Sequence, residues 1–416
     1  MRIAVVCPHF APDTAPTGAV MTRLVDELAA RGHRLDVVTS LPWYEHHRVE
    51  PGWTGRLVRT EATAWGVVRR VHPFPTDKRS IPARAAGFAG FSALAGLTGL
   101  WGGRADVVLA MSPPLTLGLT GWAMGLARRA PLVFNVQDVF PDVAVEVGAL
   151  TDRRVIRVAR WLERVTYARS AVVTVLSDDL RDNLAAKVAD ATRVRVIPNF
   201  VDTIALTPAS RHTPYRSELG LGDRTVVLYA GNVGFSQSLG LVAEAAQAWR
   251  DRPDVVFLVN GGGSALDDLR RRCAGLPNVV FAPYQPKERL AEVLATGDVH
   301  LVPLRRGLAR SSVPSKTYSI LAAGRPVLAS VDPGTEVARV VERSGAGIAV
   351  APDDPVAFLA ALDRLVTDRE ASAAMGARGR AWVEGWASPA AVAEAYERVF
   401  AEVVRGRRQG NRPPTE

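Results

Sequence analysis

The chain has 416 residues, of which 48% are hydrophobic, 22% are charged and 7% are aromatic. This length suggests two domains, and this composition excludes a mostly disordered, fibrous or coiled-coil protein. The formal net charge of +9 favours anionic partners such as nucleotide phosphates, acidic lipid or nucleic acid, and two cysteines are too few for a disulfide framework.

Apolar runs of strand length alternate with helical patterns in the first half of the chain. After the first run, one face of a predicted helix collects Val20, Met21, Leu24, Val25 and Leu28. Because the runs are continuously apolar, they are typical of strands buried on both faces of a parallel sheet. We predict strands at residues 3–8, 35–40, 107–112, 131–138, 171–177 and 194–199.

Residues 107–127 carry no charge and are long enough to span a bilayer. Pro113 and Pro114 interrupt them, so we predict a buried strand, a turn and a helix instead. No secretory signal opens the chain, and we therefore expect a cytoplasmic protein.

The strand and helix alternation resumes after a polar, proline-containing stretch at 201–223, which we predict to be a domain linker. Further strands are predicted at 225–232, 255–263, 278–284, 298–304, 325–331 and 347–352, followed by helical sequence. The predicted organisation is an N-terminal domain (1–200), the linker, a C-terminal domain (224–385), a helix crossing back to the first domain (386–404) and a disordered basic tail (405–416).

Two such alternations predict an α/β protein with two doubly wound, Rossmann-like domains. Ligands of these folds bind beyond the carboxyl ends of the strands, so two domains facing each other would form a cleft lined by those loops. Functional residues are therefore expected in the loops after the strands.

Glycines mark two of these loops. The first loop lacks GxGxxG, which argues against a nicotinamide or flavin enzyme of the usual kind. Gly18 could let an anion approach a helix N-terminus there, or could be a plain turn glycine. After the strand at 225–232, Gly231 and Gly234 flank a turn that opens a helix, which suits a backbone phosphate cradle.

The loop after the strand at 298–304 is rich in cations and hydroxyls. Both groups bind phosphate, although a basic loop is more often only solvated. The residues concerned are Arg305, Arg306, Arg310, Ser311, Ser312, Ser315 and Lys316.

Polar side chains also follow the strand at 131–138. Gln137, Asp138 and Asp142 stand there, and a carboxylate at this place can orient or deprotonate a hydroxyl, or can cap the next helix. No second carboxylate has the spacing of a two-carboxylate hydrolase, and the sequence has no GxSxG elbow or Walker loop.

A later helix is predicted to be basic along one side. Arg153, Arg157, Arg160 and Arg164 share one face, and Val155, Ala159, Leu162 and Val165 share another. Such a helix can rest on an anionic membrane surface, or its arginines can simply be solvated.

Several segments together carry a family resemblance over nearly the whole chain. They are MRIAVVCPHFAP with TGAVMTRLVDELAARGHRLDVVTS, AMSPPLTLGLTGWAMG with VQDVFPD, VVTVLSDDL with VRVIPNFVD, LYAGNVGFSQSLGLVAEA, and PSKTYSILAAGRPVLASVDPGTEVARVV. The sequence resembles the retaining family 4 glycosyltransferases with the GT-B fold. It is similar in particular to the branch that builds bacterial surface polysaccharides and glycolipids, of the colanic-acid and O-antigen type.

The resemblance implies a division of labour between the two halves. The C-terminal half would bind a nucleotide-sugar donor and the N-terminal half a saccharide or lipid-linked acceptor, with no required metal, no cofactor and no nucleic acid. Transfer would occur in the cytoplasm, at the inner face of the cell membrane.

The resemblance also assigns residues. Asp138 and Lys316 would be catalytic. The donor diphosphate would contact Gly18, Gly231, Asn232, Gly234, Arg310, Ser315 and Lys316. The base and ribose would contact Tyr284, Gln285, Ser319 and Glu336. The acceptor would contact His9, Thr17 and Gln137.

Two positions depart from the family pattern. The usual pair of glutamates falls at Ser311 and Ser319, with Glu336 as a substitute, and Phe235 to Gln237 replace the usual Arg and Lys. A catalytically degenerate, membrane-associated partner subunit is therefore an alternative. A sugar-nucleotide epimerase, another enzyme of the same fold, is a second alternative. A nucleic-acid-binding protein ranks last, because no stacking aromatics accompany the basic clusters.

Overall fold

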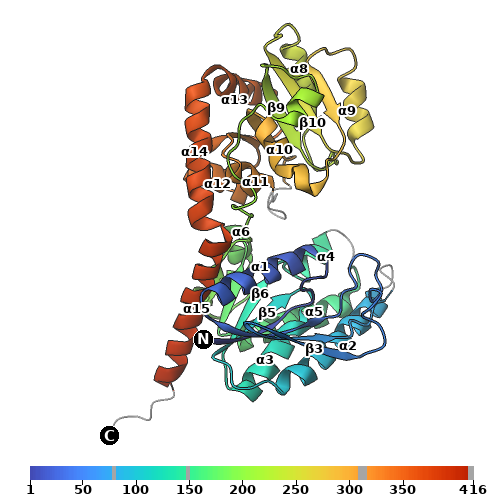
Figure 1. The fold of residues 1–416 in the computed structure, drawn as a ribbon, viewed down its shortest axis with the longest axis vertical. Helices are drawn as coiled ribbons and strands as arrows, with labels where there is room; N and C mark the ends of the chain where they lie inside the picture. The colour runs from blue at the N-terminus through green and yellow to red at the C-terminus, as the bar shows by residue number, and fades with distance from the viewer. Residues whose placement is uncertain (77–80, 147–149, 308–315, 411–416) are drawn as a thin grey trace. The chain divides into compact units, whose positions relative to one another are not determined.

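The structure is a computed structural model that describes residues 1–76, 81–146, 150–307 and 316–410. The contacts between residues divide the chain into two compact units. The first comprises residues 1–199 together with the chain from Val392 onward, and the second comprises residues 200–391 (Figure 1).

The first unit is built on an eight-stranded sheet in the order β3-β4-β2-β1-β5-β6-β7-β8. All neighbours pair in parallel except β3 and β4, and Val5 in the centre of the sheet lies between Val37 and Leu109. The strands are β1 (Arg2–Val6), β2 (Arg34–Ser40), β3 (Val58–Thr63), β4 (Gly66–Val71), β5 (Val107–Ser112), β6 (Leu132–Val136), β7 (Val172–Val175) and β8 (Val194–Val196).

Helices connect these strands and cover the sheet. One apolar core joins Val6, Val108 and Phe134 of the strands to Phe91 and Met124 of two helices. The helices are α1 (Pro16–Ala30), α2 (Ile81–Leu100), α3 (Thr116–Arg128), α4 (Asp142–Glu146), α5 (Arg153–Arg169), α6 (Asp178–Ala185) and the short helix η1 (Ala191–Arg193).

The hairpin of β3 and β4 was not predicted. The side chains of β3 alternate between exposed and half-buried, so this strand has no continuous apolar run to identify it. It pairs in antiparallel fashion at the sheet edge, where one solvated face is permitted. The six strands that were predicted in this half are confirmed.

The second unit carries a six-stranded, fully parallel sheet in the order β11-β10-β9-β12-β13-β14. This is the doubly wound order, with the direction of winding reversed between β9 and β12. The strands are β9 (Thr225–Ala230), β10 (Val255–Asn260), β11 (Val279–Ala282), β12 (Val299–Pro303), β13 (Val327–Ser330) and β14 (Gly347–Val350). All six were predicted, so the expectation of two Rossmann-like units is confirmed.

Helices again surround this sheet, and Phe257, Val259 and Leu301 pack with Phe358 and Leu362 in its largest core. The helices are α7 (Pro214–Glu218), α8 (Gly240–Ala248), α9 (Leu266–Arg272), η2 (Lys287–Arg289), α10 (Leu290–Thr296), α11 (Lys316–Ala322), α12 (Glu336–Ser344), α13 (Pro355–Thr367) and α14 (Arg369–Trp386).

Two boundaries differ from the sequence-based expectation. The stretch 201–223 contains α7, and Tyr215 and Leu221 are buried in a core of the second unit, so this stretch is part of that unit. The last helix, α15 (Pro389–Gly410), runs past residue 404, so the first part of the expected tail is helical. Residues 411–416 lie outside the described residues.

Helix α15 contributes to the first unit from Val392 onward (Figure 1). Its Glu397 accepts hydrogen bonds from Arg31 Nη1 at 2.8 Å and pairs with His33 Nε2 at 2.6 Å. Tyr396 and Phe400 are buried. Among the described residues, none of the helices combines the length and apolar character that crossing a bilayer requires, and residues 107–127 form β5 and α3.

Two glycines of α14 provide a matched test of how this helix packs within the second unit. A Cβ on Gly376 would lie 2.1 Å from the carbonyl oxygen of Gly324, whereas a Cβ on Gly385 meets nothing within 4 Å. We expect Gly376→Ala to destabilise the second unit by about 1–3 kcal/mol because the helix must shift. Gly385→Ala should stabilise it by up to about 1 kcal/mol through helix propensity. Urea unfolding of both variants measures this, and equal effects would contradict the packing.

Candidate functional site

Two glycine loops pack against each other where β9 and β10 end. Gly231 follows β9 with φ +139°, and a Cβ on Gly261, which follows β10, would lie 1.9 Å from the Gly231 carbonyl oxygen. The Gly231 amide donates to the Asn260 carbonyl, and the Val233 amide donates to the Gly262 carbonyl, both at 2.9 Å. Only glycine permits this approach.

Lys316 brings a positive charge to these loops. It is the first residue of α11, and its Nζ lies 4.1 Å from the centre of the Tyr229 ring. A Cβ on Gly231 would lie 2.9 Å from the same nitrogen, so the amine rests against the glycine turn. Burial lowers the pKa of Lys316 to about 8. No carboxylate within the described ranges pairs with this amine, which leaves it available to an anion.

Other residues predicted to bind the sugar donor lie on the turn after β9 and in the loop after β12. Asn232 is exposed on the same turn and Gly234 donates its amide to Gln237 Oε1 at 2.9 Å. Arg305 joins the turn through its amide, which donates to the Ser236 carbonyl at 3.0 Å. Arg306 is exposed, and its Nη2 donates to the Pro352 carbonyl at 3.2 Å. The other predicted members of this loop lie outside the described residues: Arg310, Ser311, Ser312 and Ser315.

The residues predicted for the base and ribose follow three strands of the second sheet, β11, β12 and β13. Tyr284, just after β11, is 57% exposed, and its hydroxyl donates to the Gly262 carbonyl at 3.3 Å. Gln285, next to it in the chain, and Ser319 on α11 are both half-buried. Glu336 opens α12 but is buried, and its Oε2 lies 3.0 Å from Arg339 Nη2. Its charge is therefore already compensated by an arginine.

In the first unit, the start of α1 packs on the loop after β1. A Cβ on Gly18 would lie 2.9 Å from His9 Cβ, so this glycine serves a close contact between helix and loop. Thr17 is half-buried beside it. The Nδ1 atom of His9 lies 2.6 Å from Asp13 Oδ2, and both side chains are buried.

Gln137 and Asp138 follow β6 but have different surroundings. The buried Gln137 amide donates to Asn135 Oδ1 at 2.6 Å and accepts from Asn199 Nδ2 at 2.8 Å, so it is engaged within the unit. Asp138 keeps an exposed side chain, yet desolvation by the surrounding protein raises its pKa. Asp138 is therefore the carboxylate at this strand end that a ligand can reach.

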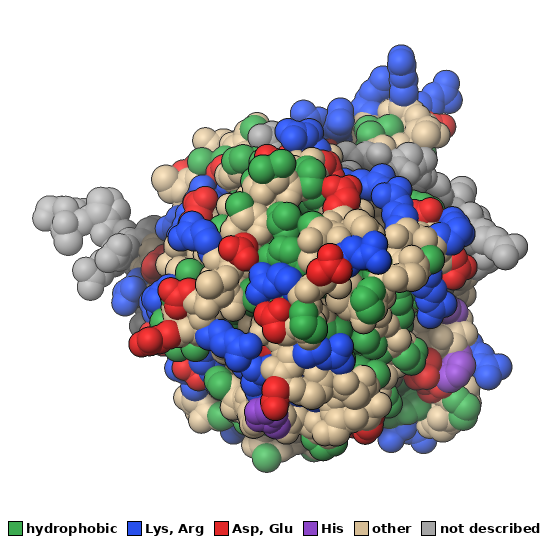
Figure 2. Space-filling view, turned by 90° about the horizontal axis from the view of Figure 1, so that it is seen from above, with side chains coloured by type: hydrophobic (Ala, Val, Ile, Leu, Met, Phe, Trp, Pro, Cys, Tyr) green, Lys and Arg blue, Asp and Glu red, His purple; other side chains and the backbone are tan. Residues whose placement is uncertain are grey.

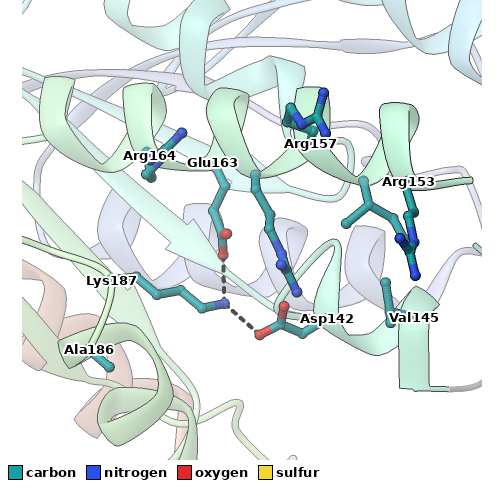
Figure 3. A pocket seen from close by; sticks show the side chains of 10 residues that line it. Asp142, Val145, Arg153, Arg157, Glu163, Arg164, Ala186 and Lys187 are labelled. Carbon is teal, nitrogen blue, oxygen red and sulfur yellow. Dashed lines mark hydrogen bonds and ion pairs between the residues drawn. The ribbon is translucent and has the colours of Figure 1, made fainter.

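A hollow of about 790 Å³ lies along α5. Its floor is an ion cluster in which Lys187 Nζ lies 2.6 Å from Asp142 Oδ2 and 3.0 Å from Glu163 Oε1 (Figure 3). Burial raises the pKa of Glu163, against the opposing effect of Lys187. Four exposed arginines of α5 line the hollow: Arg153, Arg157, Arg160 and Arg164.

This arginine row differs from the charge pattern elsewhere. On the face shown in Figure 2, many Lys and Arg side chains lie beside Asp or Glu. The row also adjoins apolar surface, because Val158 is 63% and Trp161 54% exposed. Only part of the apolar face predicted for α5 is buried: Ala159 is buried, but Val155 is exposed.

Sequence reasoning missed four residues that complete these sites: Asp13, Asn199, Tyr229 and Arg339. The spacing of His9 and Asp13 in one loop was a usable signal. The partners Tyr229 for Lys316 and Arg339 for Glu336 depend on packing or helix pairing that the motifs did not include. No group of three or more potential metal ligands occurs in the part of the chain that the structure describes.

Two doubly wound units, one with a glycine-lined cationic site at the carboxyl ends of its strands, define a protein of the GT-B class. Residues 17–199 match the sequence model of the glycosyl transferase 4-like domain, and residues 224–368 match that of the glycosyl transferases group 1. Since these matches together cover more than half of the chain, the chain belongs to this family of two-domain glycosyltransferases.

Individual relatives agree with this classification. The chain is 28% identical over 373 residues to WcaI of Escherichia coli K12, named as a colanic acid biosynthesis glycosyl transferase, covering 87% of this chain and 91% of the relative. It is 30% identical over 269 residues to the glycosyltransferase WbjE of Pseudomonas aeruginosa, covering 63% and 66%. The structure of Anabaena HepE in complex with UDP and glucose shares the fold, with a TM-score of 0.64 and 14% identity over 97% of this chain and 100% of that chain.

The ion cluster below α5 can be tested by removing its cation. Lys187→Met leaves two carboxylates together, one of them buried, and we expect a loss of about 2–3 kcal/mol in unfolding free energy at pH 7. The loss should shrink as the pH falls and Glu163 takes up a proton. The control Arg157→Met, at an exposed arginine of the same hollow, should stay within about 0.5 kcal/mol. Equal, pH-independent losses would contradict the cluster.

Proposed function

We propose that this protein transfers a sugar from a nucleotide-sugar donor to an acceptor hydroxyl, with retention of anomeric configuration, in the synthesis of a cell-surface polysaccharide or glycolipid. The observation that carries the proposal is the half-buried Lys316, whose amine rests against the Gly231 turn. The names of WcaI and the complex of HepE with UDP and glucose support the pathway and the donor class.

The donor would be bound by the second unit. Its diphosphate would take hydrogen bonds from the loop amides at 231–234 and a charge-assisted bond from Lys316. Tyr284 and Gln285 would contact the base, and Ser319 the ribose. Because Glu336 is paired with Arg339, it would contact the ribose only while sharing that arginine.

The chemistry would be a substitution at the anomeric carbon. The bond from this carbon to the phosphate oxygen breaks as the bond to the acceptor oxygen forms, and the acceptor proton passes to the departing phosphate. Lys316 would stabilise the negative charge on the diphosphate without a required metal ion. Asp138 would orient the acceptor hydroxyl.

The acceptor would be lipid-linked, and the outer face of α5 would contact the inner surface of the cell membrane. Four arginines attract anionic head groups, and the exposed Val158 and Trp161 can enter the interfacial region. This part of the proposal places the protein in the cytoplasm and on the membrane surface.

Donor binding is the direct test. A thermal-shift screen with UDP, GDP, ADP and their sugar conjugates should show a selective increase in melting temperature, because a ligand of the folded state stabilises it. Lys316→Ala should weaken donor binding by about tenfold or more, whereas Asp138→Ala should reduce transfer and leave donor binding intact. A folded protein that binds no nucleotide would favour the non-catalytic partner subunit, and product formed without an acceptor would favour an epimerase.

The low pKa of Lys316 gives this test a pH signature. The amine is charged below its pKa of about 8 and becomes neutral above it, so donor affinity should fall as the pH rises through 8. Lys316→Arg keeps its charge in this range, and its donor affinity should stay level. Calorimetric titrations of both proteins from neutral to alkaline pH measure this difference, and parallel curves would refute the role of the amine.

Membrane contact can be tested with vesicles. Replacing Arg153, Arg157, Arg160 and Arg164 by Gln should weaken binding to phosphatidylglycerol vesicles by about tenfold or more, since each basic residue contributes about 1 kcal/mol near an anionic surface. The matched control replaces four exposed arginines of the second unit by Gln: Arg250, Arg270, Arg271 and Arg272. Equal losses in both variants would show that only net charge matters.

A further inference from the structure

We propose that a hollow of about 280 Å³ in the first unit binds one pyranose ring of the acceptor, so that the acceptor presents a sugar and not a bare lipid phosphate. The inference rests on the proposed function and adds to it the chemical class of the acceptor. It concerns only residues of the first unit.

The hollow lies where three neighbouring strands end. Its walls come from the loops after β1, β2 and β4 and from α2, and β4, β2 and β1 are adjacent in the sheet. The carboxyl ends of parallel strands are the usual position of ligands in such folds. The hollow is therefore at the functional edge of the sheet.

Aromatic rings form most of the wall. Trp43 and Tyr44 follow β2, Phe74 follows β4, and Phe88 comes from α2. The His9 ring stacks on Trp43 with centres 5.6 Å apart and meets Tyr44 edge-on at 5.4 Å. The carbon–hydrogen faces of a pyranose pack against such rings, while its hydroxyls remain free for hydrogen bonds.

His9 is a polar residue of this wall, and Asp13 holds its ring in place. Asp13 accepts from His9 Nδ1, and its second oxygen accepts from the Tyr44 amide at 3.1 Å, so the carboxylate joins the loops after β1 and β2. Since Nδ1 faces Asp13, Nε2 is the ring nitrogen that is left for a ligand hydroxyl. Within the described chain, Nδ1 is the only ring nitrogen of His9 with a hydrogen-bond partner.

The backbone around the hollow is specialised. Phe74 has φ +49°, which is strained for a bulky side chain. A Cβ on Gly87 would lie 2.6 Å from the Phe74 carbonyl oxygen, and one on Gly90 would lie 3.2 Å from the Phe74 ring. Two glycines of α2 thus allow the helix to approach this strained residue and fix its ring in the wall.

The charge of the wall favours a neutral sugar over a phosphate as the ligand. Among the described residues, the nine that line the hollow include no lysine or arginine, in contrast to the row of arginines along α5. A phosphate would need cationic partners, whereas a neutral ring needs aromatic surface and a few polar groups. It follows that an earlier transferase must place a sugar on the lipid before this protein acts.

Binding and transfer assays test the inference. Methyl glycosides of glucose, galactose, mannose and N-acetylglucosamine are titrated by saturation-transfer NMR. We expect at least one to bind, and Trp43→Ala and His9→Ala each to weaken it by about tenfold with donor affinity unchanged. Trp43→Phe keeps a ring and should retain most binding. Trp101→Ala, at an exposed tryptophan beyond α2, is the matched control.

Two results would overturn the inference. One is a folded Trp43→Ala protein whose glycoside binding and transfer equal those of the wild type. The other is transfer to polyprenyl phosphate as fast as to a polyprenyl-diphosphate-linked sugar. Donor binding is measured separately by thermal shift. A wild-type protein that binds the donor but none of the glycosides refutes only this inference, whereas absence of donor binding refutes the proposed function.

Discussion

Parallel pairing of strands that are buried on both faces determines where this chain can carry chemistry. All such strands end at one edge of their sheet, so the loops that follow them are brought together whatever their separation in the sequence. In the second unit this edge gathers the glycine loops after β9 and β10, Tyr284 and Lys316. In the first it gathers His9, Trp43, Phe74 and Asp138. The two edges differ in chemistry: one is cationic and lined by glycine, and the other is aromatic with a carboxylate near it.

Lys316 and Lys187 differ in their partners, and their roles differ accordingly. Lys316 is held against an aromatic ring and a glycine turn, and burial lowers its pKa. A bound anion would therefore stabilise the charged form of this amine. Lys187 is instead held between two carboxylates and links α4 and α5 to the segment that follows α6. A lysine's role in this protein therefore depends on whether its counter-charge is supplied by the chain or by a ligand.

Apolar runs were sufficient to predict twelve of the fourteen strands in the described chain, and the family motifs pointed to the glycine loop after β9 as a candidate donor site. The β3–β4 hairpin escaped because a half-exposed strand has no continuous apolar run. Contacts fixed by side-chain packing were also beyond the sequence: the engagement of Gln137 by Asn199, the pairing of Glu336 with Arg339 and the placement of Trp43 around His9. Each depends on distances between segments that no local pattern encodes.

The return of α15 to the first unit has a consequence for how the protein is made. The second unit is one continuous stretch, residues 200–391, and it is synthesised before the part of α15 that belongs to the first unit. The first unit must wait, because Tyr396 and Phe400 fill its core and Glu397 holds Arg31 and His33. The domain that begins first is thus completed last, and until then its apolar surface is open to chaperones.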